Sequence, residues 1–249
     1  METPAVLAGK VVLVTGSSRG IGAATAVLLA KAGADVVVNY RDKRPRAEKI
    51  VEQIRALGQR SLAVQADLTD EHQVRGMFDA IRAGFGRLDV LVLNASGGLE
   101  RNMPTDYAMR LNRDAQQRAV DLALPLMPKG GRIVFVTSHY AHFYGRFTGL
   151  PAYEPVAAGK RAGEDALRNR IPELAGHGVT LVVVSGDVIK GTITATLLER
   201  ANPGLTEERQ KAVDGDLPTV EEFAAAVADA ALAPTIDSGK TIFIGSTDL

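Results

Sequence analysis

The sequence predicts an α/β protein built on one doubly wound, seven-stranded parallel sheet with helices on both faces. Seven short runs rich in Val, Leu and Ile recur at residues 11–14, 36–38, 62–64, 90–93, 133–136, 181–184 and 242–244. These runs are apolar at successive positions, which is typical of parallel strands that are covered on both faces. Strands that alternate with helical segments favour right-handed crossovers. No repeat and no dividing linker interrupts this pattern, so we expect residues 1–249 to form one domain.

The helices are expected between these runs. The first begins at a Gly-rich turn directly after the first strand and continues to Ala32. Apolar residues spaced by three and four predict further helices within 50–57, 74–81 and 220–227. A long helical segment is expected after Pro104, and Pro128 with the two glycines near it ends that segment before the fifth strand.

Composition excludes several classes of protein. The 249 residues include 29 Lys and Arg against 29 Asp and Glu, so net charge gives no general reason to bind nucleic acid or a membrane. The absence of Cys excludes disulfides, thiolate nucleophiles and Cys-bound metals. The first residues lack the features of a signal peptide, and no apolar run approaches the roughly 20 residues that span a bilayer. We therefore expect a cytoplasmic protein.

The Gly-rich turn, residues 15–22, predicts a dinucleotide site. A strand, a Gly-rich turn and a helix N-terminus together aim backbone N–H groups and a positive dipole end at a pyrophosphate. Gly16 allows the tight turn, Gly20 lets a ligand approach the backbone, and Gly22 permits close packing of helix on strand. The alternative is a turn with a structural role alone.

This turn, Gly-x-x-x-Gly-x-Gly with Thr15 before it, resembles that of the short-chain dehydrogenase/reductase family. The resemblance covers essentially the whole chain and implies a Rossmann domain. Residues that match family positions in order are Asp67 after the third strand, Asn94 after the fourth, Asn112 on the next helix, Ser138 after the fifth, and Lys160. It implies cofactor contacts from Ser18, Arg19, Ile21, Asp67, Leu68, Asn94, Lys160 and Thr192.

The end of the second strand indicates which dinucleotide is bound. An acidic residue there would bind the ribose 2′-hydroxyl of NAD, and residues 39–41 contain none. Arg41 and Arg19 favour NADP(H) instead, because a guanidinium can engage the 2′-phosphate through paired charge-assisted bonds. The alternative is that Arg41, Lys43, Arg44 and Arg46 form a solvated, basic start of a helix.

The catalytic residues depart from the family pattern at one position. The resemblance implies a Ser that polarises a carbonyl, here Ser138, and a Tyr acid four residues before a Lys, here Lys160. That position holds Val156. The nearest tyrosine is Tyr153, seven residues before Lys160, and Pro155 places it at or just before the start of the helix.

Three explanations of this departure remain open. Tyr153 is the displaced acid, since its interval of 15 residues from Ser138 is close to the family's. Alternatively, His139 or His142 supplies the proton, as an imidazole suits acid–base catalysis. In the third, the chain binds NADP(H) without turnover. No metal is expected, because the two histidines have no evident third ligand.

The substrate side offers less. Ser185 stands where the family has Pro, and Thr192 is in a position to contact the nicotinamide carboxamide. Segment 187–215 resembles the substrate-covering segment, with Leu197 and Leu198 as apolar walls. The aromatic residues of 140–147 line the ligand crevice or pack as a surface loop. The interval between Asn94 and Asn112 is short, which trims one rim.

The sequence therefore predicts an NADP(H)-dependent oxidoreductase that reduces a carbonyl, or oxidises the alcohol, of a small or carrier-bound substrate. Tyr153 would donate the proton, Ser138 orient the carbonyl, Lys160 tune Tyr153 and hold the ribose, and Asn112 support a proton relay. The resemblance implies a homo-oligomer, a dimer or a tetramer. The rival hypothesis is a non-catalytic NADP(H)-binding regulator or partner subunit of the same fold. The sequence does not identify the substrate.

Overall fold

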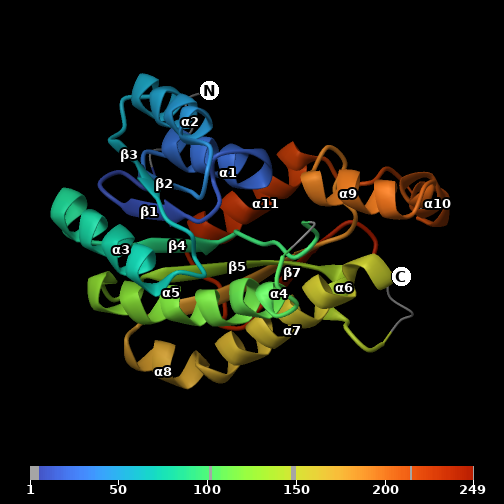
Figure 1. Ribbon diagram of the computed structural model, residues 1–249. Coiled ribbons are helices and arrows are strands. Elements are labelled where there is room, and N and C mark those ends of the chain that lie inside the picture. Colours follow the sequence, from blue (N-terminus) through green and yellow to red (C-terminus); the bar gives the residue numbers. More distant parts are fainter. Residues whose placement is uncertain (1–5, 101–102, 147–149, 214, 249) are drawn as a thin grey trace.

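The computed structural model describes residues 6–100, 103–146, 150–213 and 215–248. It contains one seven-stranded parallel sheet with the strand order β3-β2-β1-β4-β5-β6-β7, which confirms the predicted fold (Figure 1). The strands are β1 (Val11–Val14), β2 (Asp35–Tyr40), β3 (Ser61–Gln65), β4 (Val90–Leu93), β5 (Arg132–Ser138), β6 (Thr180–Gly186) and β7 (Thr241–Ile244). The chain moves outward from β1 to β3 and then returns to β4 beside β1, so the order of strands reverses at the β1–β4 boundary.

Helices cover both faces of this sheet, as Figure 1 shows. One face carries α1 (Gly20–Lys31), α2 (Arg44–Ala56) and α11 (Val220–Leu232). The other carries α3 (Glu71–Phe85), α5 (Ala115–Ala123), α7 (Glu154–Asn169) and the short α8 (Ile171–Gly176). The sheet is therefore the middle of three layers, and its five inner strands are buried over most of their length, whereas the edge strands β3 and β7 are partly exposed.

The core consists of two apolar clusters, one on each side of the sheet. Along β1, Val12 and Val14 belong to the cluster beneath α1 and α11, whereas Leu13 belongs to the cluster beneath α3 and α5. Successive side chains of a strand point to opposite faces, so a strand buried on both faces needs an apolar residue at every position. This requirement explains the unbroken apolar runs in the sequence.

The helical segment after Pro104 is not the regular helix that the sequence suggests. It consists of α4 (Tyr107–Met109), a π-helical turn (Arg110–Asp114), α5 and a 3₁₀ turn (Leu124–Leu126). Asn112 Nδ2 donates to the carbonyl of Ala108 at 2.8 Å, and Gln116 Nε2 donates to that of Leu111 at 2.8 Å. These side-chain amides donate to backbone carbonyls of the preceding turn, which accounts for the π-helical pitch at residues 110–114.

The remaining elements gather at the carboxyl ends of the strands. The four-residue helix α6 (His139–His142) follows β5, and α9 (Ile193–Ala201) and α10 (Leu205–Ala212) follow β6 (Figure 1). In open α/β sheets, ligands bind outside the carboxyl ends of the strands where the strand order reverses. Within the described parts of the chain, no helix is both long and apolar enough to cross a membrane.

Candidate active site

A cleft of about 650 Å³ lies at the carboxyl ends of the strands. Every residue expected to bind the cofactor lines it: Gly16, Ser18, Arg19, Gly20, Ile21, Gly22, Arg41, Asp67, Leu68, Asn94, Lys160 and Thr192. Ser138 and Tyr153 line the same cleft. The structure thus brings together residues from the two halves of the sheet, on both sides of the β1–β4 boundary.

The Gly-rich turn requires glycine at three positions, for backbone conformation at Gly16 and Gly20 and for close packing at Gly22. Gly16 and Gly20 have φ angles of 64° and 56°, in the left-handed region that favours glycine. A Cβ on Gly22 would lie 2.5 Å from Asn94 Nδ2 and 2.7 Å from the Gly16 carbonyl oxygen. Asn39, which the sequence analysis did not assign to the site, accepts a 3.0 Å hydrogen bond from the Gly16 N–H. These contacts leave an open backbone cradle at the start of α1, and a pyrophosphate fits such a cradle.

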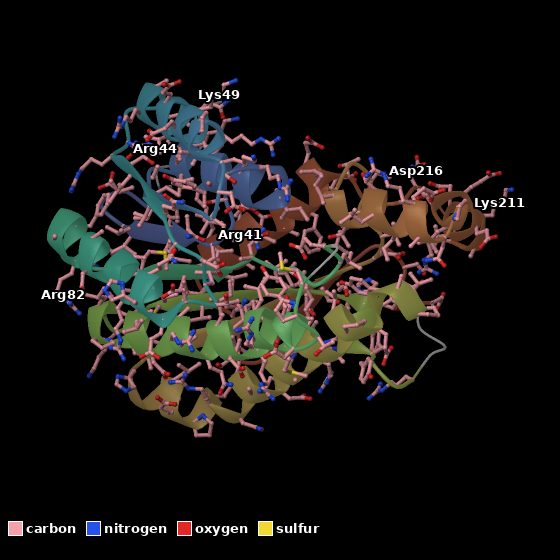
Figure 2. The ribbon with its side chains drawn as sticks, viewed as in Figure 1. Arg41, Arg44, Lys49, Arg82, Lys211 and Asp216 are labelled. Atoms are coloured by element: carbon pink, nitrogen blue, oxygen red, sulfur yellow. The ribbon has the colours of Figure 1, made fainter. Side chains whose placement is uncertain are left out.

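The basic residues after β2 differ in their position. Arg41, Lys43 and Arg46 line the cleft, whereas Arg44 pairs with Glu48 at 3.2 Å on the outside of α2. Figure 2 shows Arg41 near the middle of the molecule and Arg44 on its outer helix. Arg41 is therefore part of the cleft and not only of a solvated helix start.

Ser138 and Tyr153 are direct partners. Ser138 Oγ lies 3.0 Å from the Tyr153 hydroxyl, and Oγ also accepts a 3.3 Å hydrogen bond from the Ala141 N–H. Tyr153 ends a 3₁₀ turn and precedes α7, as Pro155 predicts. Burial raises the pKa of Tyr153 to about 12, so its hydroxyl keeps its proton at neutral pH. Val156, which holds the family's usual Tyr position, is buried in the apolar cluster around Tyr153.

Lys160 lies at the cleft as a buried cation. Its side chain is only 8% exposed, and among the described residues no carboxylate forms an ion pair with it. Burial lowers the pKa of Lys160 to about 8, since desolvation disfavours the charged form. A buried amine of this kind, without a protein acceptor, fits the hydroxyl groups of a ribose.

Two glycines on α7 allow this helix, which carries Lys160, to pack closely against α4 and the π-helical turn. A Cβ on Gly163 would lie 2.1 Å from the Asn112 carbonyl oxygen, and one on Gly159 would lie 2.8 Å from that of Ala108. Asn112 itself is buried behind the cleft and does not line it; its Nδ2 donates to the Gly97 carbonyl at 2.9 Å. Its Oδ1 is buried without a hydrogen-bond partner among the described residues.

Neither candidate histidine lines the cleft. His139 is fully buried, its Nδ1 lies 2.8 Å from Ser185 Oγ, and burial lowers its pKa to about 4. His142 Nδ1 lies 2.8 Å from a carboxylate oxygen of the buried Glu164. Both rings therefore have structural partners away from the Ser138 hydroxyl, and this geometry gives no support to a histidine acid.

The aromatic segment after β5 divides between two roles. Tyr140 lines the main cleft and also a smaller cavity of about 210 Å³, to which Phe143 and Tyr144 contribute. The Phe143 ring stacks on Phe243 at a centroid distance of 5.6 Å. Phe147 lies outside the described residues. Both expectations for this segment, crevice wall and packed loop, thus hold for part of it.

The expected substrate-covering segment closes one side of the cleft. Leu197 and Leu198 of α9 line the cleft, as expected, and Thr192 caps α9 by accepting a 3.1 Å hydrogen bond from the Ala195 N–H. A buried ion pair, which the sequence analysis missed, joins α10 to the end of β6: Arg209 Nη2 lies 2.8 Å from Asp187 Oδ2. Asp214 of this segment lies outside the described residues.

With this geometry established, comparison with known proteins identifies the family. The model of the short chain dehydrogenase family matches residues 10–202 of the chain. The chain belongs to the short-chain dehydrogenase family. Its relatives include a hydroxynaphthalene reductase-like protein, Arp2, of Metarhizium majus, which is 35% identical over 195 residues, or 76% of this chain and 72% of the relative.

Solved structures of other short-chain dehydrogenases have the same architecture. The angucycline C-6 ketoreductase LanV with bound NADP is 30% identical with a TM-score of 0.79, over 97% of this chain and 96% of that one. A short-chain dehydrogenase from Burkholderia cenocepacia in complex with NADP is also 30% identical, with a TM-score of 0.80 over 98% of this chain and 99% of that one. This short-chain dehydrogenase therefore belongs to an oxidoreductase family that includes named ketoreductases.

Proposed function

We propose that this protein is an NADP(H)-dependent ketoreductase in which Tyr153 is the proton donor. The observation that carries the proposal is the 3.0 Å contact between Tyr153 OH and Ser138 Oγ inside the cleft that Lys160 also lines. Two hydroxyl groups that face one cleft can both bind a carbonyl oxygen, which is the arrangement that carbonyl reduction needs. The NADP complexes of similar structures support the choice of cofactor.

The residues of this chain divide the work of binding. Gly16, Gly20 and Gly22 would hold the pyrophosphate, Arg41 the 2′-phosphate, and Lys160 the ribose next to the nicotinamide. Asp67 and Leu68 would contact the adenine, and Thr192 the carboxamide. When bound, the cofactor supplies the hydride that the protein lacks.

Four residues around the substrate carbonyl would control the transfer of a proton to its oxygen. Without substrate, the contact between Ser138 Oγ and the Tyr153 hydroxyl uses the hydrogen of one of the two groups. A carbonyl oxygen bound between them would accept both hydrogens, while Ser138 Oγ would still accept from the Ala141 N–H. Tyr153 holds its proton until negative charge develops on that oxygen, because burial disfavours a phenolate. Lys160, when charged, favours the phenolate that remains after transfer. Asn112, behind the cleft, would support the relay that returns a proton to this group.

The walls of the cleft favour a substrate with an apolar, cyclic body. Tyr140, Leu197 and Leu198 line the cleft beside Ser138, and the smaller aromatic cavity shares Tyr140 and Tyr153 with it. Flat rings pack well on such surfaces. The names of the hydroxynaphthalene reductase-like and angucycline relatives agree with a ketone on an aromatic ring system as the substrate. We therefore propose this substrate class, together with oxidation of the corresponding alcohol in the reverse direction.

The test is NADPH oxidation with quinones, cyclic diketones and 3-oxoacyl thioesters, for the wild type and Tyr153→Phe. We expect the variant to lose at least about a hundredfold in kcat, since a positioned acid contributes at least that factor. Calorimetry should give the same NADPH affinity for both proteins. Retained turnover in the variant would exclude Tyr153 as the donor, and tight NADPH binding without turnover on any substrate would favour a binding protein.

Domain organisation and assembly complete the proposal. We propose that residues 1–249 act as one domain, with segment 187–215 over the substrate, and that the protein is a homo-oligomer. Membership in the short-chain dehydrogenase family supports both statements. Light scattering coupled to gel filtration should give the mass of a dimer or tetramer of the 26.4 kDa chain, and a monomer would contradict this part.

A further inference from the structure

Arg41 and Tyr107 form a contact that joins two walls of the cofactor cleft. Arg41 follows β2, whereas Tyr107 begins α4, 66 residues later in the chain. Arg41 Nη1 donates a 2.5 Å hydrogen bond to the Tyr107 hydroxyl. Both side chains line the cleft, as do Asp67 and Leu68 at the expected adenine site.

The guanidinium of Arg41 is held at two points. Its Nε donates to Asp42 Oδ2 at 2.8 Å, and its Nη1 donates to Tyr107. A guanidinium carries five N–H donors, so three remain without a partner among the described residues. An Arg side chain loses rotamer entropy when a ligand fixes it, and a side chain that is already held loses less on binding.

Tyr107 is suited to hold this guanidinium because it is itself fixed. Only 4% of the residue is exposed, and its ring belongs to the buried apolar cluster that contains Leu68 and Leu111. Burial also raises the pKa of Tyr107, so its hydroxyl stays neutral and accepts from the cation without neutralising it. Asp42 is the carboxylate that pairs with Arg41, at Nε, and Tyr107 adds no second negative charge. The remaining N–H donors of Nη1 and Nη2 are therefore open to a further anion.

We propose that Tyr107 is a positioning residue that makes the cleft selective for NADP(H) over NAD(H). It holds Arg41 so that the remaining N–H donors face the monoester phosphate on the 2′-oxygen of the adenine ribose. NADH lacks this phosphate and gains nothing from the arrangement. The inference rests on the proposed use of NADP(H), and it assigns the selectivity to a pair of residues rather than to Arg41 alone.

The test compares three variants with the wild type by calorimetric Kd for NADPH and for NADH at one ionic strength. Tyr107→Phe keeps the buried ring and removes only the acceptor, and we expect NADPH to bind about fivefold more weakly, the loss from one hydrogen bond. The Kd for NADH should stay within about twofold, because that dinucleotide carries no 2′-phosphate. Arg41→Ala should weaken NADPH about thirtyfold, since it removes the charge-assisted bonds.

Arg44→Ala is the matched control, because Arg44 has the same charge three residues away and lies outside the cleft; both Kd values should match the wild type.

Arg41→Ala separates the two proposals. If it leaves the ratio of the two Kd values unchanged, the proposed role of Arg41 in NADP(H) use fails. If Arg41→Ala reduces the preference for NADPH over NADH and Tyr107→Phe leaves that preference unchanged, only the role of Tyr107 is overturned. Tighter binding of both dinucleotides to Tyr107→Phe would likewise overturn it, since the contact would then block the cleft. Thermal melting must show that all variants are folded.

Discussion

Lys160 is expected to destabilise the free protein at neutral pH. Its amine is buried without an ion-pair partner in the described structure, and desolvation lowers its pKa from the ordinary 10.5 to about 8. Below pH 8 the folded and the unfolded chain both carry the charge, and the folded chain bears the full penalty of burying it. The difference between the two pKa values corresponds to about 3 kcal/mol.

Lys160→Met should remove this penalty, because Met has a similar length and no charge. We expect its free energy of unfolding at pH 7 to exceed that of the wild type by about 2–3 kcal/mol. As the pH rises, Lys160 of the wild type loses its proton in the folded state near pH 8 and in the unfolded state only near pH 10.5. The free energy of unfolding of the wild type therefore rises relative to that of the variant between these two pH values. Above that range both states are neutral, and the difference should approach zero.

Urea unfolding of both proteins at pH 7 and at pH 10 measures this difference. Lys49→Met is the control, since Lys49 is exposed on α2 and its replacement should change stability by less than about 0.5 kcal/mol (Figure 2). A variant that is less stable than the wild type at pH 7, or a difference that is the same at both pH values, would refute the reasoning. Activity should be lost in the more stable protein, as is common where a site needs a buried charge.

The buried amine of Lys160, the packing of Gly163 and the Arg209–Asp187 ion pair can each be perturbed separately. NADPH binding at pH 8 should take up a fraction of a proton, detected by calorimetry in buffers of different ionisation enthalpy, because an acceptor raises the pKa of Lys160. Gly163→Ala should lower the free energy of unfolding by about 1–3 kcal/mol through overpacking against Asn112, whereas exposed Gly76→Ala should raise it by up to about 1 kcal/mol. Arg209→Met should accelerate amide exchange in α9 and α10 while β4 exchanges at the wild-type rate, since Asp187 loses its buried partner.

Most of the fold was predictable because burial on two faces leaves a strong pattern. Every one of the seven apolar runs is a strand, since the strands between the two edges are covered on both faces and are apolar at most positions. The π-helical turn was not predictable from the same pattern. It depends on where the amides of Asn112 and Gln116 bond, and an apolar periodicity carries no information about side-chain hydrogen bonds.

The residues of the candidate site were predictable to the extent that topology fixes them. Parallel strands end at one edge, so residues such as Asp67 and Asn94 that follow different strands line a common cleft. The partners of those residues were not predictable. Arg41 with Tyr107 and Asp187 with Arg209 are pairs from separate elements, and in the sequence each charge is indistinguishable from a solvated one.

The displaced tyrosine shows why spacing alone could not settle the chemistry. Four-residue spacing matters only because it puts two side chains on one helical face, and what a carbonyl requires is a hydroxyl at a particular point. Here the position four residues before Lys160 is used for packing: Val156 Cγ2 lies 3.0 Å from where a Cβ on Gly98 would be. The chain instead reaches Ser138 from the 3₁₀ turn before α7, where Tyr153 has room beside Tyr140 at a ring distance of 6.4 Å. A tyrosine hydroxyl can thus reach Ser138 from another turn of the chain. The proposal that Tyr153 is the proton donor rests on this contact and not on the interval in the sequence.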